Sequence, residues 1–522
     1  MRSVHCLIVV ALISAIARAD EPAAPRVERR SKITIGRDTT VVDGPLDSAG
    51  YVDYAAALDQ RLKIPAGDNF IAALWENIGP TFDGRPVQAE YFAALGIETP
   101  PVQGEYFISA REFEFRSPIK FDTDEFNDQG NAALNPWLPK ELPLMAAWVG
   151  ANERVADRLV AAADRRGVFI PVAVRPQPWR PELIKSNGNE DERTVYYLSH
   201  LLMRRATLRM GQRNFDAAWR DLLALHRIAR LFARTHSDFG TIPNHYAVMT
   251  DEVFLAHADG KQNRFARCLA DLEKLAPAQP ALDPIDVFER YMMLEHLQTT
   301  VRVGHPLFET LDRSWVSSTP AGLEAQAEYD LNDALREANR RCDQLVAAHR
   351  LADRAKRRAE LQRITAEVKQ INAEWRKRER IFDGTRSGPP IEPEVLGRYA
   401  FASAFSRLTW SDLDADQNQY DQRFDNIKVA FALAAFRADH ARYPDKLNDL
   451  FPRYLAAIPK DGFSGGPLRY QRRGNGYLLY SVGENGIDDD GRDSSDDPQS
   501  NLPAAQRRET VRKFDDLRVR MP

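Results

Sequence analysis

The stretch that decides the interpretation of the chain is residues 424–498, FDNIKVAFALAAFRADHARYPDKLNDLFPRYLAAIPKDGFSGGPLRYQRRGNGYLLYSVGENGIDDDGRDSSDDP. Its local sequence signals agree with one another. Apolar residues spaced by three and four positions near the start predict a short amphipathic helix. Tyr443-Pro444 ends that helix, since the residue before a proline is driven out of helical geometry. Residues 468–472 and 477–481 are predicted strands, and the glycines and asparagine at 473–476 are typical of a hairpin turn. We therefore expect a small α+β module.

The same stretch contains five short motifs in a characteristic order. They are Tyr443-Pro444, Pro452-x-Tyr454-Leu455, Ile458-Pro459-Lys460-Asp461, Gly465-Gly466-Pro467-Leu468-x-Tyr470 and Tyr480-Ser481-Val482-Gly483-Glu484-Asn485-Gly486. They resemble the globular head of the major pseudopilin of bacterial type II secretion systems, over about seventy-five of the 522 residues. Pseudopilins begin with a hydrophobic helix that polymerises, and no such helix precedes residue 424. The resemblance therefore implies a pseudopilin-like head module reused in a longer protein, rather than a pilus subunit.

An acidic segment, Asp488-Asp489-Asp490-Gly491-Arg492-Asp493-Ser494-Ser495-Asp496-Asp497, follows the second predicted strand. Composition alone favours a solvated acidic loop, and residues 499–522 continue it as a charged tail. The resemblance instead implies a loop that binds calcium through carboxylates and main-chain oxygens, although Asn485 stands where the family usually has Asp. We predict one structural calcium ion, bound with the help of a main-chain carbonyl near Val482. The predicted ligand side chains are Asn485, Asp488, Asp490, Asp493 and Asp496.

Length and composition indicate a large helical protein. A chain of 522 residues is long enough for two or more hydrophobic cores. Its 71 basic and 75 acidic residues are interspersed and give a net charge of −4. We therefore expect neither a nucleic-acid partner nor electrostatic attachment to an anionic membrane. Helical periodicity dominates before residue 424, so the predicted fold class is mainly α.

The N-terminus is typical of a secretory signal peptide, which we predict over residues 1–19. An apolar run over residues 6–16 is followed by Ala17-Arg18-Ala19, a small-x-small cleavage site. The run is too short to span a bilayer, and an uncleaved anchor is the alternative. Residues 20–50 are predicted to be a mostly disordered leader. We expect a periplasmic or extracellular protein with no membrane span after cleavage.

Residues 51–310 are predicted to form one helical domain. Within it, Asn214-Phe215-Asp216-Ala217-Ala218-Trp219 opens a helix shortly after Gly211, a pattern that resembles one tetratricopeptide helical hairpin. No second copy follows at a period of about 34 residues, so the pattern predicts antiparallel helix packing and not a repeat array. The predicted buried side of this hairpin consists of Phe215, Ala218, Leu222, Leu225 and Ala229.

Residues 320–383 are predicted to form long charged helices, because they are dense in Arg, Lys and Glu. Two apolar runs, 331–345 and 361–375, keep a spacing of three and four residues. One interrupted coiled coil and two antiparallel helices joined near Arg350 fit this pattern equally well. Residues 384–394, with three prolines and two glycines, are the predicted linker to the C-terminal part.

The chemistry-bearing residues show no catalytic signature. The serines and glycines form no nucleophile elbow and no phosphate-binding loop. Cys268 and Cys342 are interpreted as buried thiols, with pairing left open. The spacing of the histidines in the helical region matches no zinc ligand set, so they are interpreted as ordinary surface or half-buried residues. These histidines include His226, His236, His245 and His257.

These observations favour an exported protein with a non-enzymatic structural or protein-interaction role and a calcium-stabilised C-terminal module. Two alternatives stay open. The chain could be a component associated with the type II secretion machinery, as the resemblance implies. It could also be an enzyme whose site is assembled from scattered residues of the helical domain, which one sequence does not expose. We expect its partners among envelope or secretion proteins.

Overall fold

A computed structural model gives the fold of most of the chain. It describes residues 33–82, 85–116, 120–174, 189–232, 241–275, 284–303, 331–351, 353–381, 394–395, 397–398, 401–402, 410–493, 496 and 514–521. The predicted signal peptide lies outside the described residues, as does the predicted linker apart from Glu394. Among the helices of these ranges, none combines the length and the apolar character needed to cross a membrane.

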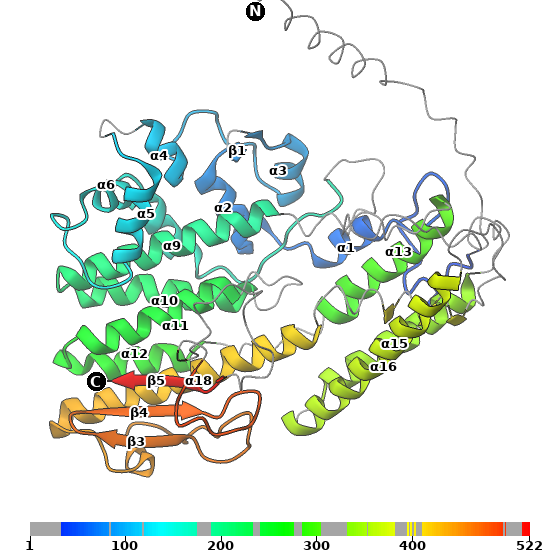
Figure 1. The fold of residues 1–522 in the computed structure, drawn as a ribbon. Helices are drawn as coiled ribbons and strands as arrows, with labels where there is room; N and C mark the ends of the chain where they lie inside the picture. The colour runs from blue at the N-terminus through cyan, green and yellow to red at the C-terminus, as the bar shows by residue number, and fades with distance from the viewer. Residues whose placement is uncertain are drawn as a thin grey trace, which may run out of the picture.

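The chain folds into two lobes, each with its own hydrophobic core, and the prediction of a mainly α-helical protein is confirmed (Figure 1). The helices of the first lobe are α2 (Phe70–Ile78), α3 (Ala89–Leu95), α4 (Ala110–Arg116), α5 (Thr123–Ala132), α6 (Pro143–Ala151), α7 (Glu153–Ala162), α9 (Asn189–Gly211), α10 (Phe215–Phe232), α11 (Thr241–His257), α12 (Arg264–Glu273) and α18 (Trp410–His440). Those of the second lobe are α1 (Tyr54–Leu62), α13 (Arg290–Val303), α15 (Asn332–His349) and α16 (Arg354–Ile381).

Short elements complete the two lobes. The strands β1 (Thr81–Phe82) and β2 (Arg85–Pro86) pair antiparallel after α2. The short helical turns are η1 (Ala66–Asp68), η3 (Lys261–Asn263), η4 (Pro284–Glu289, a π-helical turn) and η7 (Leu447–Leu450). Side-chain caps fix several helix starts, because they accept from otherwise unpaired N–H groups. Asp53, Asn69 and Asp122 cap α1, α2 and α5 in this way.

The antiparallel pair α9–α10 is the predicted hairpin of the helical region. Arg213, with φ of 58°, turns the chain between the two helices. Its predicted buried side is confirmed, because all five side chains are no more than 3% exposed: Phe215, Ala218, Leu222, Leu225 and Ala229. A buried ion pair, with Arg205 Nη2 2.7 Å from Asp221 Oδ1, joins α9 to α10 inside this packing.

The helix α18 lies between the helical array and the sheet, packing on α11 and α12 and on β4 and β5 (Figure 1). It begins at Trp410, so the predicted helix start near Phe424 is wrong, and Asn426 lies within the helix. Residues 427–436 are buried on nearly every side. A helix enclosed in this way is apolar on all sides and has no single apolar stripe. The first turns of α18 are polar, so the apolar pattern did not reveal that the helix begins before residue 424.

The C-terminal sheet has the order β3–β4–β5 and is antiparallel throughout. The prediction of two strands and a hairpin is confirmed, since β3 (Arg469–Arg473) pairs with β4 (Gly476–Ser481). The third strand, β5 (Leu517–Met521), pairs with β4 and lies within the predicted charged tail. That part of the tail is therefore ordered. Its alternating Leu, Val and Met side chains are buried, whereas the arginines between them made the segment look like solvated tail.

The second lobe also differs from the sequence-based boundaries. Residues 33–50 are not a disordered leader, because Thr39 and Thr40 are buried and Asn339 Nδ2 donates to the Thr39 carbonyl at 2.7 Å. These contacts with α15 span about 300 residues of sequence, so local composition could not reveal them. The helices α1 and α13, assigned to one helical domain with α9–α12, belong to the second core. The helix α15 ends at His349 and α16 begins at Arg354, so they are two separate helices.

Candidate metal centre

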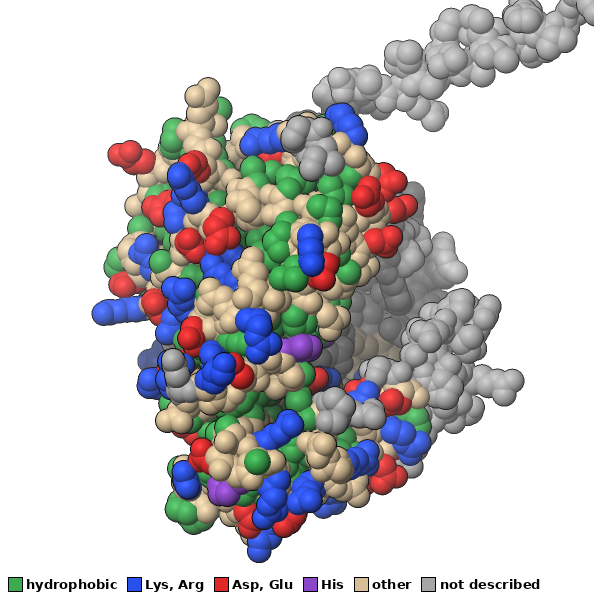
Figure 2. Space-filling model, turned by 90° about the vertical axis from the view of Figure 1, so that its left-hand side faces the viewer, with side chains coloured by type: hydrophobic (Ala, Val, Ile, Leu, Met, Phe, Trp, Pro, Cys, Tyr) green, Lys and Arg blue, Asp and Glu red, His purple; other side chains and the backbone are tan. Residues whose placement is uncertain are grey.

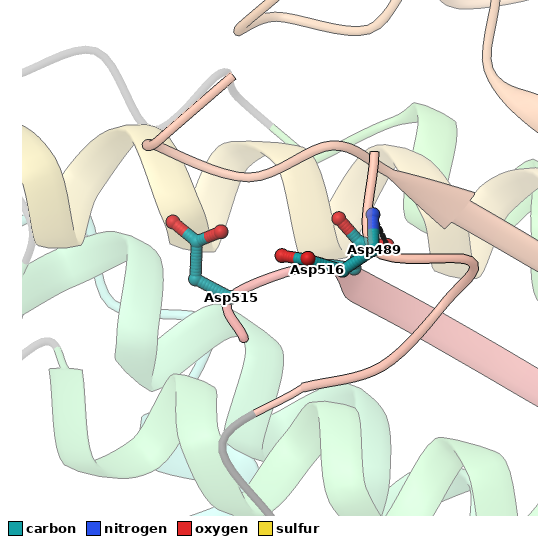
Figure 3. Close-up of side chains that lie close together, drawn as sticks. All are labelled: Asp489, Asp515 and Asp516. Atoms are coloured by element: carbon teal, nitrogen blue, oxygen red, sulfur yellow. Dashed lines mark hydrogen bonds between the residues drawn. The ribbon is translucent and has the colours of Figure 1, made fainter. Parts of the chain in front are cut away.

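Three carboxylates converge at the edge of the C-terminal sheet. Asp489 lies in the loop after β4, and Asp515 and Asp516 lie directly before β5. One carboxylate oxygen from each lies within 4.8 Å of the others (Figure 3). Asp489 and Asp516 are fully buried, and Asp515 is half-buried. Residues separated by 25 or more positions thus present one group of oxygen atoms.

Strand pairing and two glycines bring these side chains together. In the antiparallel register Ser481 lies opposite Leu517, which places the start of β5 beside the end of β4. Gly483 has φ of 68°, and a Cβ there would lie only 2.2 Å from the Asp515 carbonyl oxygen. Gly491, with φ of 75°, lets the loop fold back onto Leu478. Only glycine permits both the left-handed backbone and such close approach.

The hydrogen bonds within the cluster are incomplete. Asp516 Oδ2 accepts from the N–H groups of Asp489 and Gly491, at 3.0 and 2.8 Å. Asp515 Oδ2 accepts from the Asn485 N–H at 2.8 Å. The Oδ1 atoms of Asp515 and Asp516 are buried and have no hydrogen-bond partner within the described residues. Buried acceptor atoms without a donor are uncommon and suggest a ligand.

Burial and mutual repulsion disfavour charge on these carboxyls. Burial, with the nearby charges of Asp489 and Asp488, raises the pKa of Asp516 to about 6. Burial also raises the pKa of Asp515, with a further contribution from Asp489. A cation in the cluster would remove this penalty, because it attracts all the carboxylates at once. The charge pattern therefore suits a cation better than an anion or a neutral ligand.

The ligand types narrow the choice of cation. All the converging groups are carboxylates, and no histidine or cysteine belongs to the group. Hard cations such as Ca²⁺ prefer oxygen ligands and take six to eight of them, including main-chain carbonyls and water. Zinc and copper sites normally include nitrogen or sulfur. Three carboxylates would hold Ca²⁺ with room for further oxygen ligands.

Three of the predicted ligands are engaged with arginines. Asp488 Oδ2 lies 3.1 Å from Arg469 Nε, and its Oδ1 accepts from the Tyr480 hydroxyl at 2.9 Å. Asp493 Oδ2 lies 3.1 Å from Arg518 Nε, and Asp496 pairs with the same arginine. The structure therefore separates these three carboxylates into two ion-pair groups.

Neither of the other two predicted ligands belongs to the three-carboxylate cluster. Asn485 donates its N–H to Asp515, and its Nδ2 lies 3.4 Å from Asp489 Oδ2. Asp490 is exposed, with φ of 59°. Sequence reasoning missed Asp489, Asp515 and Asp516 as a group. The available signal was the alternation of apolar residues in 517–521 immediately after two aspartates, which predicts a strand beginning at an acidic pair.

Comparison with known protein families, with curated proteins and with solved structures gives no match to this chain.

A second feature is a surface pocket of about 580 Å³ between the end of α2 and α4. Exposed Val102 and Phe115 belong to its lining. Its charged lining residues are Arg111, Glu112 and Arg116, of which Glu112 and Arg116 pair with each other. On the face drawn in Figure 2, basic and acidic side chains are interspersed with apolar ones. The lining of the pocket thus mixes apolar and polar side chains, and one of its two arginines is paired with Glu112.

The described histidines of the helical region occupy different environments. His226 is buried, and its Nε2 lies 2.8 Å from Asp251 Oδ2 between α10 and α11. Burial raises the pKa of Asp251. His245 lies beside Tyr246, His257 bonds its own helix, and His236 lies outside the described residues. The interpretation as surface or half-buried residues is therefore wrong for His226. Cys268 and Cys342 are buried and free.

Proposed function

We propose that this chain is an exported helical protein with a structural or protein-interaction role, and that Asp489, Asp515 and Asp516 bind one calcium ion that stabilises its C-terminal module. The observation that carries the calcium site is the convergence of three carboxylates, two of which, Asp515 and Asp516, have buried Oδ1 atoms with no donor among the described residues. Without a cation, the burial and mutual repulsion of these carboxylates destabilise the fold, and a bound cation would remove that cost.

The ion would act on the fold, because its ligands come from both sides of a strand pairing. Asp489 belongs to the loop that leaves β4, and Asp515 and Asp516 belong to the segment that enters β5. A bound ion would therefore fasten β5 and the loop together. By mass action, calcium at about one hundred times its dissociation constant would add about 2.7 kcal/mol to the free energy of unfolding.

Two further considerations support the proposal. The order of helix, hairpin and acidic loop is the one predicted for residues 424–498, the stretch that carries the pseudopilin resemblance, and β5 is added to its sheet. The predicted signal peptide would deliver the protein to a compartment in which calcium is available at the concentrations that weaker sites need. An association with secretion proteins rests on the resemblance, and its test is affinity capture from an envelope fraction with the full chain as bait.

Thermal unfolding of the full chain in calcium and in chelator tests the site. The wild type should melt at a higher temperature in calcium, and Asp516→Asn should abolish this difference. Asp490→Asn is the matched control, because Asp490 is exposed in the same loop, and its variant should respond to calcium as the wild type does.

The outcomes are separable. A response lost in Asp490→Asn but kept in Asp516→Asn would assign the ion to the ligands that the acidic loop alone suggested. Equal melting temperatures of the wild type in calcium and in chelator, with no calcium binding by calorimetry, would contradict the calcium site altogether. The melting difference within each variant is the readout, so a change in the variant's own stability does not obscure the result.

A further inference from the structure

A stripe of polar and aromatic side chains follows one face of α9, far in sequence from the carboxylate cluster. Tyr196, His200 and Arg204 recur every four residues, so they lie on the same side of the helix. Tyr246 joins them from α11, and the His200 ring lies 4.4 Å from the rings of both Tyr196 and Tyr246. Trp148 of α6 lies at the other end, with the Arg204 guanidinium carbon 5.6 Å from its ring centre.

Arg204 is half-buried, and no carboxylate in the described part of the chain pairs with it. Within the described residues its buried Nε has no hydrogen-bond acceptor, and its guanidinium enters no ion pair. Its neighbour Arg205 lies 2.7 Å from both Asp157 and Asp221. Burial lowers the pKa of Arg204, and the titratable groups that oppose this effect are the phenols of Tyr196 and Tyr246. A guanidinium with unused N–H groups is well suited to bind a planar oxyanion.

The remaining polar groups of the cluster are neutral. Burial lowers the pKa of His200 to about 3, so its imidazole is uncharged at neutral pH. Burial and the Tyr196 hydroxyl raise the pKa of Tyr246 to about 12. The Tyr246 hydroxyl lies 2.5 Å from His200 Nε2. Positive charge in this group therefore comes from Arg204, and the phenols of Tyr196 and Tyr246 are near enough to influence its pKa.

The cluster is open to solvent, and the protein leaves room for the guanidinium. Tyr196 is 39% exposed, and Met249 on the neighbouring helix is 38% exposed. Gly130 of α5 lies where a Cβ would be 2.7 Å from Arg204 Nη2. A glycine inside a helix costs about 0.5–1 kcal/mol of stability relative to alanine. The missing Cβ of Gly130 leaves the space in which the Arg204 guanidinium lies against Trp148.

We propose that Arg204, together with the hydroxyl of Tyr196 and the indole face of Trp148, forms a binding site for the carboxylate or phosphate group of a small molecule. The guanidinium supplies the charge and two parallel N–H donors, and Tyr196 supplies a third donor at the solvent side. His200 and Tyr246 orient Tyr196. The competing explanation is that Arg204 only packs against Trp148 as a cation on an aromatic face.

Titration calorimetry of the full chain with inorganic phosphate, benzoate and acetate separates these explanations, with chloride as the control for ionic strength. The wild type should bind phosphate or benzoate saturably. The tighter of the two identifies the anionic group, and benzoate tighter than acetate shows that an aromatic carrier is favoured. Arg204→Met should weaken binding by about tenfold or more, since charge-assisted hydrogen bonds are lost. Arg220→Met, at an exposed arginine of α10, should bind as the wild type does.

Tyr196→Phe removes only a hydroxyl and should weaken binding severalfold while the fold is retained. This variant keeps the test decisive if Arg204→Met fails to fold. No saturable binding of any of the three anions by the wild type would overturn the proposal. Equal affinity of wild type and Arg204→Met, with circular dichroism showing both folded, would overturn it as well and would leave Arg204 as a packing residue.

Discussion

Alanine at Gly483 should destabilise the protein far more than alanine at Gly486, although both glycines have φ of 68°. A left-handed backbone costs an L-residue about 1–2 kcal/mol, and both variants incur this cost. At Gly486 an added Cβ meets no atom of the described residues within 4 Å, so no further loss of stability is expected. At Gly483 the Cβ would lie 2.2 Å from the Asp515 carbonyl oxygen and 2.8 Å from Asp515 Oδ1.

That contact adds a second cost at Gly483. The segment before β5 must move by about 1 Å, and overpacking of this kind typically costs about 1–3 kcal/mol. The movement also strains the hydrogen bond from the Asn485 N–H to Asp515 Oδ2, which is worth about 1 kcal/mol. We therefore expect Gly483→Ala to lose about 3–6 kcal/mol, against about 1–2 kcal/mol for Gly486→Ala.

Urea denaturation followed by circular dichroism, in calcium and in chelator, measures both effects. Gly483→Ala should also lose the stabilisation by calcium, because Asp515 is displaced, whereas Gly486→Ala should keep it. Equal losses of unfolding free energy in the two variants would refute the close approach of the loop to Asp515. A large loss of unfolding free energy in Gly483→Ala with an unchanged response to calcium would support the close approach of the loop to Asp515. It would also show that this approach is not needed for ion binding.

Three other variants test the interior. Leu222→Ala should lower the free energy of unfolding by about 2–5 kcal/mol, and an unchanged urea midpoint would contradict its burial. His226→Ala should cost about 3–5 kcal/mol, because Asp251 keeps a buried carboxyl without its partner, and replacing both by leucine should recover part of the loss. Burial raises the pKa of Glu252 from 4.5 to about 7, so the folded state binds the extra proton. Stability should therefore fall as pH rises from about 4.5 to 7 in the wild type, and less in Glu252→Gln.

Local signals in the sequence predicted the parts of the fold that depend on neighbouring residues. The hairpin of β3 and β4 follows from the glycines and asparagine at 473–476 between two predicted strands, and the buried side of α10 follows from helical spacing. Both require contacts only within one or two elements. The acidic character of the loop after β4 was visible for the same reason.

The features of the fold that the sequence did not predict depend on contacts between residues far apart in the chain. Asp515 and Asp516 reach the loop through the pairing of β5 with β4, and an intervening segment of more than thirty residues separates these strands. Asp488 shows this limit most clearly, since the resemblance implied that it binds calcium and the fold pairs it with Arg469 instead. The buried segment at Thr39 likewise depends on Asn339. Pairings of this range are decided by tertiary packing and not by local pattern.

The two cores alternate along the chain. Among the described residues, the buried apolar side chains between 52 and 58 belong to the second core and those between 70 and 275 to the first, apart from Val172. Those between 287 and 402 belong to the second core, and those between 424 and 521 to the first again. No single cut therefore yields two self-sufficient halves. A fragment beginning at Phe424 would expose Phe431, which packs on Trp219, Phe254 and Phe265 of the distant helical array. Truncated fragments should therefore be insoluble or unfolded. If the C-terminal module occurred in another protein, that protein would have to supply a surface that replaces these helices.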